Sequence, residues 1–315
     1  MRKTGLTQTI TPLGLGCWVF EPAAWQGQRD AELLGAMSAA FQNGVTHFDT
    51  ATGYGNGYSE RLVGRFLPGR REQIFLASKA GIRSEDPQEM LASVHSSLTR
   101  LQTDYIDLYY IHWPREDMDL RPAMEGLELA RQQGLIRAVG VSNFSVEQME
   151  QVSQVGQIDA CQFGYNLFWR YPEQDVIPYC ASRKIPIVTY GSIAMGILTG
   201  KFPRQVQIAP GDMRRDGILL FQEPTWGAIW QAVEEMKTLA QEIDRPLLHL
   251  AIRWVIQRPG VASALVGARN AQQAREIAAA LEGEIPLSLF ERLTAISDQA
   301  MRFVPERGHM YDVSP

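Results

Sequence analysis

Two kinds of segment alternate along the chain. Short apolar runs, several of them β-branched or aromatic throughout, are separated by longer stretches in which apolar residues recur at helical spacing. Runs of this kind are typical of strands buried on both faces of a parallel sheet. They predict strands over Leu13–Gly16, Val45–Asp49, Ile74–Lys79, Tyr105–His112, Ala138–Asn143, Ala160–Asn166, Ile185–Tyr190 and Ala262–Gly267. The intervening stretches predict helices over Asp30–Asn43, Ser59–Leu67, Pro87–Leu101, Pro122–Gln133, Ser145–Val155, Gln174–Lys184, Ile229–Glu242 and Gln272–Leu281.

This alternation indicates the fold class. Eight strands and eight helices over about 250 residues favour a (β/α)8 TIM barrel in a single domain spanning residues 1–315. A doubly wound open sheet is the alternative, and it requires a reversal of strand order that a sequence does not display.

Two features depart from strict alternation. Thr4–Ile10 predicts an N-terminal β-hairpin arm ahead of the first barrel strand. A long loop between Thr199 and Gly227, and an additional helix over Pro246–Gln257, come before the last strand. Because long loops in compact domains are usually functional, we expect the long loop between Thr199 and Gly227 to contribute to the functional site.

Composition narrows the possible partners. The net charge is −5, the pI is about 5.6 and no block of Lys or Arg is present, so we expect no nucleic-acid partner. No stretch reaches the roughly 18 apolar residues that a membrane span needs, and the N-terminal residues lack the apolar run of a secretory signal. Cys17, Cys161 and Cys180 show no CxxC spacing and are typical of core residues in a reducing compartment. We expect a cytoplasmic protein.

Four side chains that carry proton chemistry stand at or just after the ends of predicted strands. Asp49 ends the second strand within FDTATGYG, and Tyr54 follows it by five residues. Lys79 ends the third strand and His112 the fourth. Each residue alone also fits a purely structural role. Asp49 could cap a helix, and Tyr54 could cover apolar surface. Lys79 could be a solvated charge, and His112 a hydrogen-bonded histidine at the rim of the barrel. Because catalytic residues of a TIM barrel gather where the strands end, we expect these four to meet at one mouth.

Together the four residue types suit proton delivery. A cation beside a phenol favours the phenolate and lowers the phenol pKa, and a carboxylate holds that cation in place. Lys79 and Asp49 would in this way bring Tyr54 toward the acidity that a general acid needs.

The chain resembles the aldo-keto reductase family over nearly its whole length. The four strand-end residues are similar to that family's catalytic tetrad, which implies that Tyr54 is the general acid tuned by Lys79 and Asp49. His112 would orient the substrate carbonyl. The stretch RQQGLIRAVGVSNF, Arg131–Phe144, resembles a second signature of the family.

The resemblance implies the cofactor NADPH/NADP+, bound at the barrel mouth without a GxGxxG motif. Ser142, Asn143 and Gln162 would hold the nicotinamide amide, and Tyr190 would stack on its ring. Ser142 and Asn143 are also plausible caps for the helix that starts near Ser145. The other implied cofactor contacts are Gly191, Ser192, Gly196, Leu198, Gly200, Lys201, Gly267, Arg269, Gln273 and Glu276.

Two of these contacts suit the phosphates of the cofactor. Lys201 ends GILTGK, which resembles the family's pyrophosphate loop, and its ammonium supplies positive charge there. Arg269 stands at a predicted helix N-terminus, a place that favours anions, and could grip a 2′-phosphate bidentately. This favours NADPH over NADH.

Three positions depart from the family pattern. Ile277 stands where asparagine is usual, which puts one adenine hydrogen bond in doubt. Gly191 lies in YGSIAMG, where the family more often reads Tyr-Ser-Pro-Leu, and Gly164 replaces a glutamate. The tetrad is unaffected.

The sequence gives less information about substrate recognition. Trp18 and Trp113 are candidate apolar walls of the substrate pocket, and Phe168 and Trp169 could join them, although all four could equally be rim or core residues. We expect a small or medium aldehyde or ketone.

Three functions remain open on the sequence alone. The first is hydride transfer from NADPH to a carbonyl. The second is an NADPH-binding, reductase-like regulatory subunit with little turnover. The third is a Schiff-base aldolase or lyase in which Lys79 is the covalent nucleophile.

Overall fold

The eight predicted strands close into a parallel barrel in the computed structural model, which describes residues 10–311. Each strand pairs in parallel with the next along the chain, and the last strand returns to pair with the first. The TIM-barrel prediction is confirmed and the doubly wound alternative is wrong. The strands are β1 (Leu13–Gly16), β2 (His47–Asp49), β3 (Phe75–Ala80), β4 (Ile106–Ile111), β5 (Ile136–Ser142), β6 (Ala160–Gly164), β7 (Ile187–Tyr190) and β8 (Val261–Val266).

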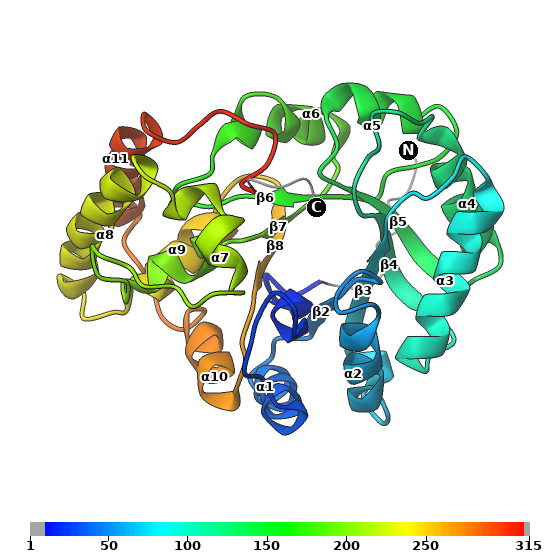
Figure 1. Cartoon of the computed structure of the whole chain (residues 1–315), viewed down its shortest axis with the longest axis horizontal. Coiled ribbons are helices and arrows are strands. Elements are labelled where there is room, and N and C mark those ends of the chain that lie inside the picture. Colours follow the sequence, from blue (N-terminus) through cyan, green and yellow to red (C-terminus); the bar gives the residue numbers. More distant parts are fainter. Residues whose placement is uncertain (1–9, 312–315) are drawn as a thin grey trace.

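Helices surround the barrel (Figure 1). The additional helix before the last strand is confirmed as α9, and the helix predicted from Ile229 begins earlier, at Thr225. The final helix, α11, was not predicted. The helices are α1 (Asp30–Gln42), α2 (Tyr58–Phe66), α3 (Pro87–Leu101), α4 (Arg121–Gln132), α5 (Val146–Val152), α6 (Val176–Arg183), α7 (Met213–Asp216), α8 (Thr225–Gln241), α9 (Leu247–Ile256), α10 (Ala271–Ala279) and α11 (Leu287–Met301). The predicted hairpin arm Thr4–Ile10 lies outside the described residues, except for Ile10, which is not in a strand.

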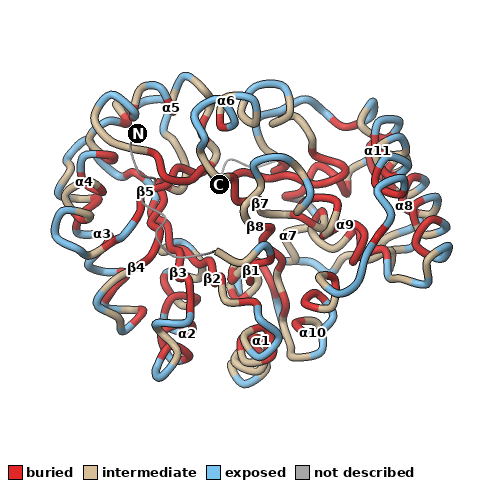
Figure 2. Tube along the Cα trace, turned by 180° about the vertical axis from the view of Figure 1, so that it is seen from behind, coloured by how far each residue is buried: buried red, intermediate tan, exposed pale blue. Residues whose placement is uncertain are grey.

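The barrel strands are buried because helices cover their outer face and apolar side chains fill the interior. Every residue of β2, β3, β4 and β6 is buried, and the tube in Figure 2 shows burial concentrated along the strands. Side chains alternate along a strand, so Phe75, Ala77 and Lys79 share one face of β3. Phe75 and Ala77 belong to an apolar cluster that is separate from the main core. Four barrel strands build it, and Ile10 packs against it: Phe75, Ala77, Leu108, Tyr110, Ala138 and Ala160. Lys79 therefore points into the barrel, at the end of β3 where the mouth lies.

The chain after α11 returns to that mouth (Figure 1). There it pairs with the long loop between β7 and α8, through an antiparallel bridge between Ile218 and Tyr311. The Leu219 N–H also donates to the Met310 carbonyl over 3.1 Å. The long loop and the C-terminal segment thus form one connected part of the rim.

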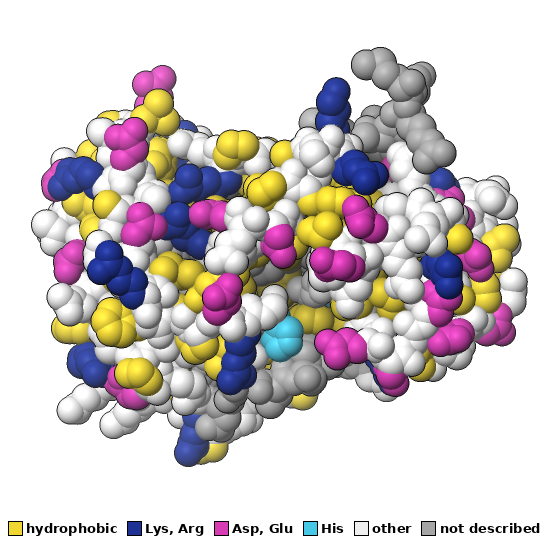
Figure 3. Space-filling model, turned by 90° about the horizontal axis from the view of Figure 1, so that it is seen from above, with side chains coloured by type: hydrophobic (Ala, Val, Ile, Leu, Met, Phe, Trp, Pro, Cys, Tyr) yellow, Lys and Arg dark blue, Asp and Glu magenta, His cyan; other side chains and the backbone are white. Residues whose placement is uncertain are grey.

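The surface carries charges of both signs. On the face drawn in Figure 3, acidic and basic side chains are interspersed. Within residues 10–311, no helix combines the length and the apolar character needed to cross a membrane.

Candidate active site

The C-terminal ends of the barrel strands open into one cavity of about 410 Å³. Most of the residues predicted to form the site line it. Lys79 is fully buried, and Leu198 and Gly200 are not among the lining residues. The predicted residues that line the cavity are Trp18, Asp49, Tyr54, His112, Trp113, Ser142, Asn143, Gln162, Tyr190, Gly191, Ser192, Gly196, Lys201, Gly267, Arg269, Gln273 and Glu276.

A buried ion pair lies at the floor of the cavity. The Lys79 ammonium donates to Asp49 Oδ1 at 2.5 Å and to the Thr50 carbonyl at 2.8 Å. Its third contact is the Tyr54 hydroxyl, 3.3 Å away. All three ammonium protons are thereby engaged. Because both charges are almost fully buried, each needs the other, and removing one would leave the second uncompensated.

The acidity of Tyr54 differs from the expectation drawn from its sequence neighbours. Burial raises the pKa of the phenol well above its ordinary value, and the Asp49 carboxylate raises it further. Burial likewise raises the pKa of Asp49, while Lys79 lowers it. The expected lowering of the Tyr54 pKa is therefore not found, since burial and the Asp49 carboxylate both act to raise it. The phenol carries its proton, which is the form that a proton donor requires.

His112 is held as a neutral base. Burial, and to a lesser extent the Lys79 charge, lower the pKa of its imidazole well below the usual value. Its ring meets that of Tyr54 edge-on, with the ring centroids 5.7 Å apart. A neutral imidazole can donate one hydrogen bond without bringing a second positive charge next to Lys79.

A chain of polar side chains follows the tetrad around the barrel. Gln162 Nε2 donates to Asp49 Oδ2 at 2.9 Å, and the Tyr190 hydroxyl donates to Asn143 Oδ1 at 2.7 Å. The Asn143 amide donates in turn to Ser142 Oγ at 3.0 Å. These side chains offer amide and hydroxyl groups to the cavity that Tyr54 also lines.

The alternative role for Ser142 and Asn143 as helix caps is wrong. Ser145 itself is the N-cap of α5, where its hydroxyl accepts from the Gln148 N–H and the Gln148 side chain accepts from the Ser145 N–H. Ser142 and Asn143 are left to face the cavity.

Positive charge gathers at the other end of the cavity. Burial lowers the pKa of Lys201, and the nearby Arg214 and Arg269 guanidinium groups lower it further. Asp212 neutralises Arg214 in part, through an ion pair that also caps α7. Three cations lining one cavity repel one another, and a polyanion bound between them would remove that cost.

The start of α10 adds to this end of the cavity. Asn270 caps the helix by accepting from the Gln273 N–H, and the Gln273 side chain accepts from the Arg269 N–H, both over 2.9 Å. These two bonds fix the backbone that carries the Arg269 guanidinium. Ile277, one turn further on, lines the cavity with an apolar side chain.

The walls near Tyr54 are aromatic. Trp18 and Trp113 line the cavity as predicted, but Phe168 and Trp169 do not. Asn166 accepts from the Phe168 N–H with its side chain and bridges to Trp169, a turn that buries both rings in the core. The prediction that they could join the pocket wall is wrong.

Several lining residues escaped the sequence analysis, among them Arg214 and Tyr311. Arg214 comes from the long loop, whose length was the only signal that it serves the site. Tyr311 comes from the C-terminal segment, for which no signal was recognised. Among the described residues, no group of three His, Cys, Asp or Glu side chains is arranged to hold a metal ion.

Comparisons with known proteins agree with this geometry. The model of the aldo/keto reductase family matches residues 12–298. The chain is 36% identical to the aldo-keto reductase YhdN of Bacillus subtilis over 287 residues, covering 87% of this chain and 86% of that protein. It is 29% identical to an NADH-specific methylglyoxal reductase of Escherichia coli, over 87% of this chain and 90% of that one.

Solved structures show the same relationship. The glycerol dehydrogenase AKR11B4 of Gluconobacter oxydans superposes with a TM-score of 0.85 at 31% identity, over 98% of this chain and 96% of that one. An aldo-keto reductase of Klebsiella pneumoniae in complex with NADPH has a TM-score of 0.75 at 27% identity, over 97% and 95% of the two chains. The family expected from the tetrad and the Arg131–Phe144 signature is thus confirmed: this chain belongs to the aldo/keto reductase family.

Proposed function

We propose that the protein is an NADPH-dependent oxidoreductase that reduces aldehydes or ketones to alcohols, with Tyr54 as the general acid. One observation carries the proposal. A protonated phenol lies 3.3 Å from a buried, carboxylate-paired ammonium at the floor of a cavity whose other end holds three cations. The first end suits proton delivery and the second suits the phosphates of a dinucleotide.

The residues present fit such a cofactor. Lys201, Arg214 and Arg269 would hold its phosphates, with Arg269 assigned to the 2′-phosphate. Ser142, Asn143 and Gln162 would hold the nicotinamide amide beside the ring of Tyr190. When bound, NADPH supplies the hydride.

The chain's own residues handle the proton. Tyr54 donates its hydroxyl proton to the oxygen of the carbonyl being reduced. Lys79, 3.3 Å from that hydroxyl, stabilises the phenolate that remains, and Asp49 holds the ammonium in place. His112 donates a hydrogen bond that orients the carbonyl toward Tyr54.

The covalent alternative fits the geometry poorly. A lysine that forms an imine must first be a neutral amine. The Lys79 nitrogen instead donates hydrogen bonds to Asp49, to the Thr50 carbonyl and to the Tyr54 hydroxyl, so it is engaged on all sides and is not free to attack a carbonyl carbon. The regulatory alternative makes a different prediction, namely cofactor binding without turnover.

An assay of NADPH absorbance with a panel of aldehydes and ketones tests the function. The reductase proposal expects consumption that depends on the carbonyl compound. Binding of NADPH with no consumption across the panel would favour a regulatory subunit, and the absence of binding would contradict both functions.

We expect Arg269→Ala to weaken NADPH binding by about 10–150-fold and NADH binding far less, because only NADPH carries the 2′-phosphate and charge-assisted hydrogen bonds have this strength. Fluorescence titration with both cofactors measures the two dissociation constants. The comparison is informative because similar proteins differ in cofactor: the Escherichia coli relative is NADH-specific and the Klebsiella structure holds NADPH.

Arg275→Ala is the matched control. Arg275 is exposed on α10, the helix that begins just after Arg269, and does not line the cavity, so its loss changes net charge equally without touching the site. Equal weakening of both cofactors in Arg269→Ala would mean that this guanidinium does not bind the 2′-phosphate.

A further inference from the structure

The loop that carries Tyr54 is weakly defined by its own residues. Between β2 and α2, three consecutive residues, Gly55, Asn56 and Gly57, have left-handed backbones, with φ of 58°, 50° and 78°. Gly57 is the N-cap of α2 and makes no side-chain cap hydrogen bond. Because neither regular structure nor a cap fixes this loop, the position of Tyr54 depends on contacts that the first turn of α2 makes with the rest of the barrel.

Ser59, in that first turn, makes three such contacts from a fully buried position. Its hydroxyl donates to the Cys17 carbonyl at 3.0 Å and accepts from the Thr50 hydroxyl at 2.8 Å. Its backbone N–H donates to the Tyr54 carbonyl over 3.2 Å. A serine hydroxyl has one proton to donate and oxygen lone pairs that accept, so both hydroxyl contacts form together. Ser59 thus ties the Tyr54 loop to the chain just after β1 and just after β2.

These contacts close a circuit with the groups proposed to move the proton. The Thr50 carbonyl accepts from the Lys79 ammonium at 2.8 Å, and that ammonium is 3.3 Å from the Tyr54 hydroxyl. The Thr50 hydroxyl leads to Ser59, whose N–H leads back to Tyr54. The circuit therefore runs through Tyr54, Lys79, Thr50 and Ser59. Ser59 itself does not line the cavity.

The contact between Lys79 and Tyr54 is sensitive to small movements. Hydrogen bonds from N–H groups to oxygen usually span about 2.7–3.2 Å, and a separation of about 3.6 Å is no longer one. At 3.3 Å, the ammonium and the hydroxyl are within roughly 0.3 Å of losing their contact. Displacing a reacting group by about 1 Å can lower a rate about a hundredfold. A residue that holds this distance therefore controls the rate without touching substrate or cofactor.

A second anchor keeps α2 in place independently of Ser59. Glu60 is fully buried, and its carboxylate accepts from the Ser78 hydroxyl at 2.6 Å and from Arg100 Nε at 2.5 Å. Ser78 lies on β3, next to Lys79. Because Glu60 holds the helix against β3, loss of the Ser59 hydroxyl should shift the Tyr54 loop without detaching α2.

We propose that Ser59 is a positioning residue for proton transfer, which sets the Tyr54 hydroxyl against the Lys79 ammonium through the hydrogen-bonded circuit. The proposal rests on the reductase function proposed above and adds to it a residue outside the cavity. Its effect falls on kcat, because Ser59 contacts neither the carbonyl compound nor the proposed cofactor contacts.

The kinetics of Ser59→Ala test this role. We expect kcat for propanal reduction to fall about 10–100-fold, while KM for propanal and the NADPH dissociation constant change by less than about twofold. The solvent deuterium isotope effect on kcat should rise, because proton transfer becomes slow relative to the other steps. A merely structural loss of active enzyme would instead lower kcat by the same factor in ordinary and heavy water.

A pair of substitutions at Thr50 tests the circuit at its next member, and does so even if Ser59→Ala does not fold. Thr50→Val keeps the shape of the side chain and removes the hydroxyl that donates to Ser59. It should lower kcat and raise the isotope effect as Ser59→Ala does. Thr50→Ser keeps the hydroxyl and should restore kcat relative to Thr50→Val. Equal losses of kcat in both Thr50 variants would overturn the proposal.

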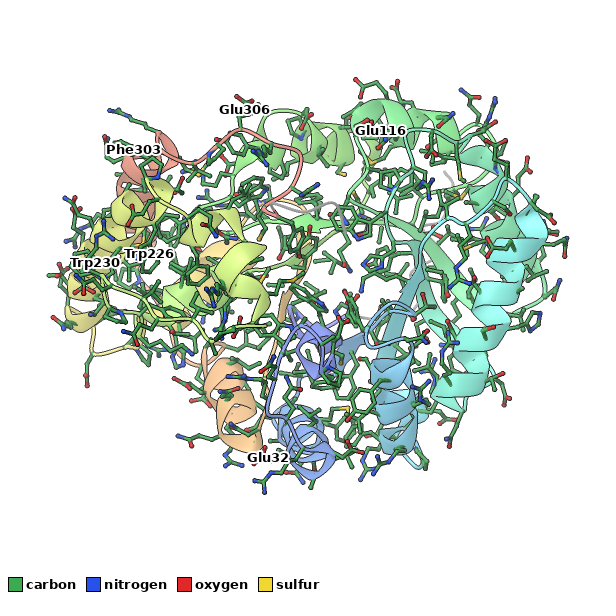
Figure 4. All side chains as sticks on the ribbon, in the orientation of Figure 1. Glu32, Glu116, Trp226, Trp230, Phe303 and Glu306 are labelled. Atoms are coloured by element: carbon green, nitrogen blue, oxygen red, sulfur yellow. The ribbon has the colours of Figure 1, made fainter. Side chains whose placement is uncertain are left out.

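Ser297→Ala is the matched control. Ser297 is also a fully buried helix serine, whose hydroxyl donates to the Leu167 carbonyl and accepts from Arg170. It lies on α11, on the other side of the barrel from α2, and the labelled Phe303 marks the chain just beyond the end of that helix (Figure 1 and Figure 4). Its loss should lower the melting temperature, as loss of the Ser59 hydroxyl does, and leave kcat and the isotope effect unchanged.

Crystal structures of the wild type and Ser59→Ala separate this proposal from the function itself. The distance between Lys79 Nζ and Tyr54 Oη should lengthen beyond hydrogen-bond range in the variant. Such a lengthening would support the positioning role even if the wild type reduced no carbonyl compound, an outcome that would contradict only the reductase function. An unchanged distance would overturn the positioning role whatever the kinetics. An active wild type whose kcat survives both Ser59→Ala and Thr50→Val would overturn it as well.

Discussion

Replacing Tyr54 by phenylalanine is expected to lower kcat for aldehyde reduction by about 10²–10⁴-fold, the usual contribution of a general acid. The change removes one hydroxyl and keeps the ring, so its contacts with Trp18 and His112 are retained. NADPH binding should be largely retained, because the proposed phosphate and amide contacts come from other strands. Steady-state kinetics and fluorescence titration of NADPH measure the two effects.

Tyr58→Phe is the matched control for this variant. Tyr58 lies four residues further along, at the start of α2, and its hydroxyl donates to Asp30 rather than facing the cavity. Its loss should leave kcat unchanged. A Tyr54→Phe enzyme that keeps more than about a tenth of the wild-type kcat would contradict the assignment of Tyr54 as the proton donor.

Lys79→Met is expected to lower kcat by about a hundredfold, because the phenolate left after proton donation loses the adjacent charge that stabilises it and general acids contribute rate factors of this order. The methionine has a similar length but leaves the buried Asp49 carboxylate without its ion pair. We therefore expect a lower melting temperature as well, and circular dichroism should establish that the variant is folded before its kinetics are interpreted.

Borohydride treatment in the presence of carbonyl substrates separates the two roles proposed for Lys79. The electrostatic role predicts no change in intact mass, because no imine forms. A substrate-sized adduct on Lys79 together with loss of activity would establish the lyase mechanism. An impaired Lys79→Met enzyme that still binds NADPH and forms no adduct would support the electrostatic role.

The barrel was predictable because its strands are continuous apolar runs, buried on both faces and separated by helical spacing. The tetrad was predictable for a related reason: each member stands within a few residues of a strand end, so local sequence places it at the mouth. Closure of the barrel is enough to bring Asp49, Lys79 and His112 together, because each of them stands at the end of a strand. The acidity of Tyr54 was not predictable, because it depends on how strongly the folded site excludes water.

The remaining errors come from contacts between distant parts of the chain. Tyr311 enters the site because Met310 packs on Gly164 and Gly191, more than a hundred residues away, and no local pattern announces such a contact. Arg214 reaches the cavity only because the long loop folds back across it. Phe168 follows a strand end as Trp113 does, yet a tight turn directs its ring into the core.

The charges at the two ends of the cavity differ in burial. Dissolved salt therefore screens them to different extents. Ions in physiological buffer screen exposed charges over a Debye length of about 8 Å, but buried pairs are screened much less. Of the cavity cations, Lys201 keeps an exposed part although desolvation lowers its pKa, and Arg269 is half-buried, whereas the side chains of Lys79 and Asp49 are only 1% and 3% exposed. We therefore expect ionic strength to change the affinity for the polyanionic cofactor and hardly to change the proposed proton transfer, so that the two steps would be electrostatically insulated from each other within one cavity.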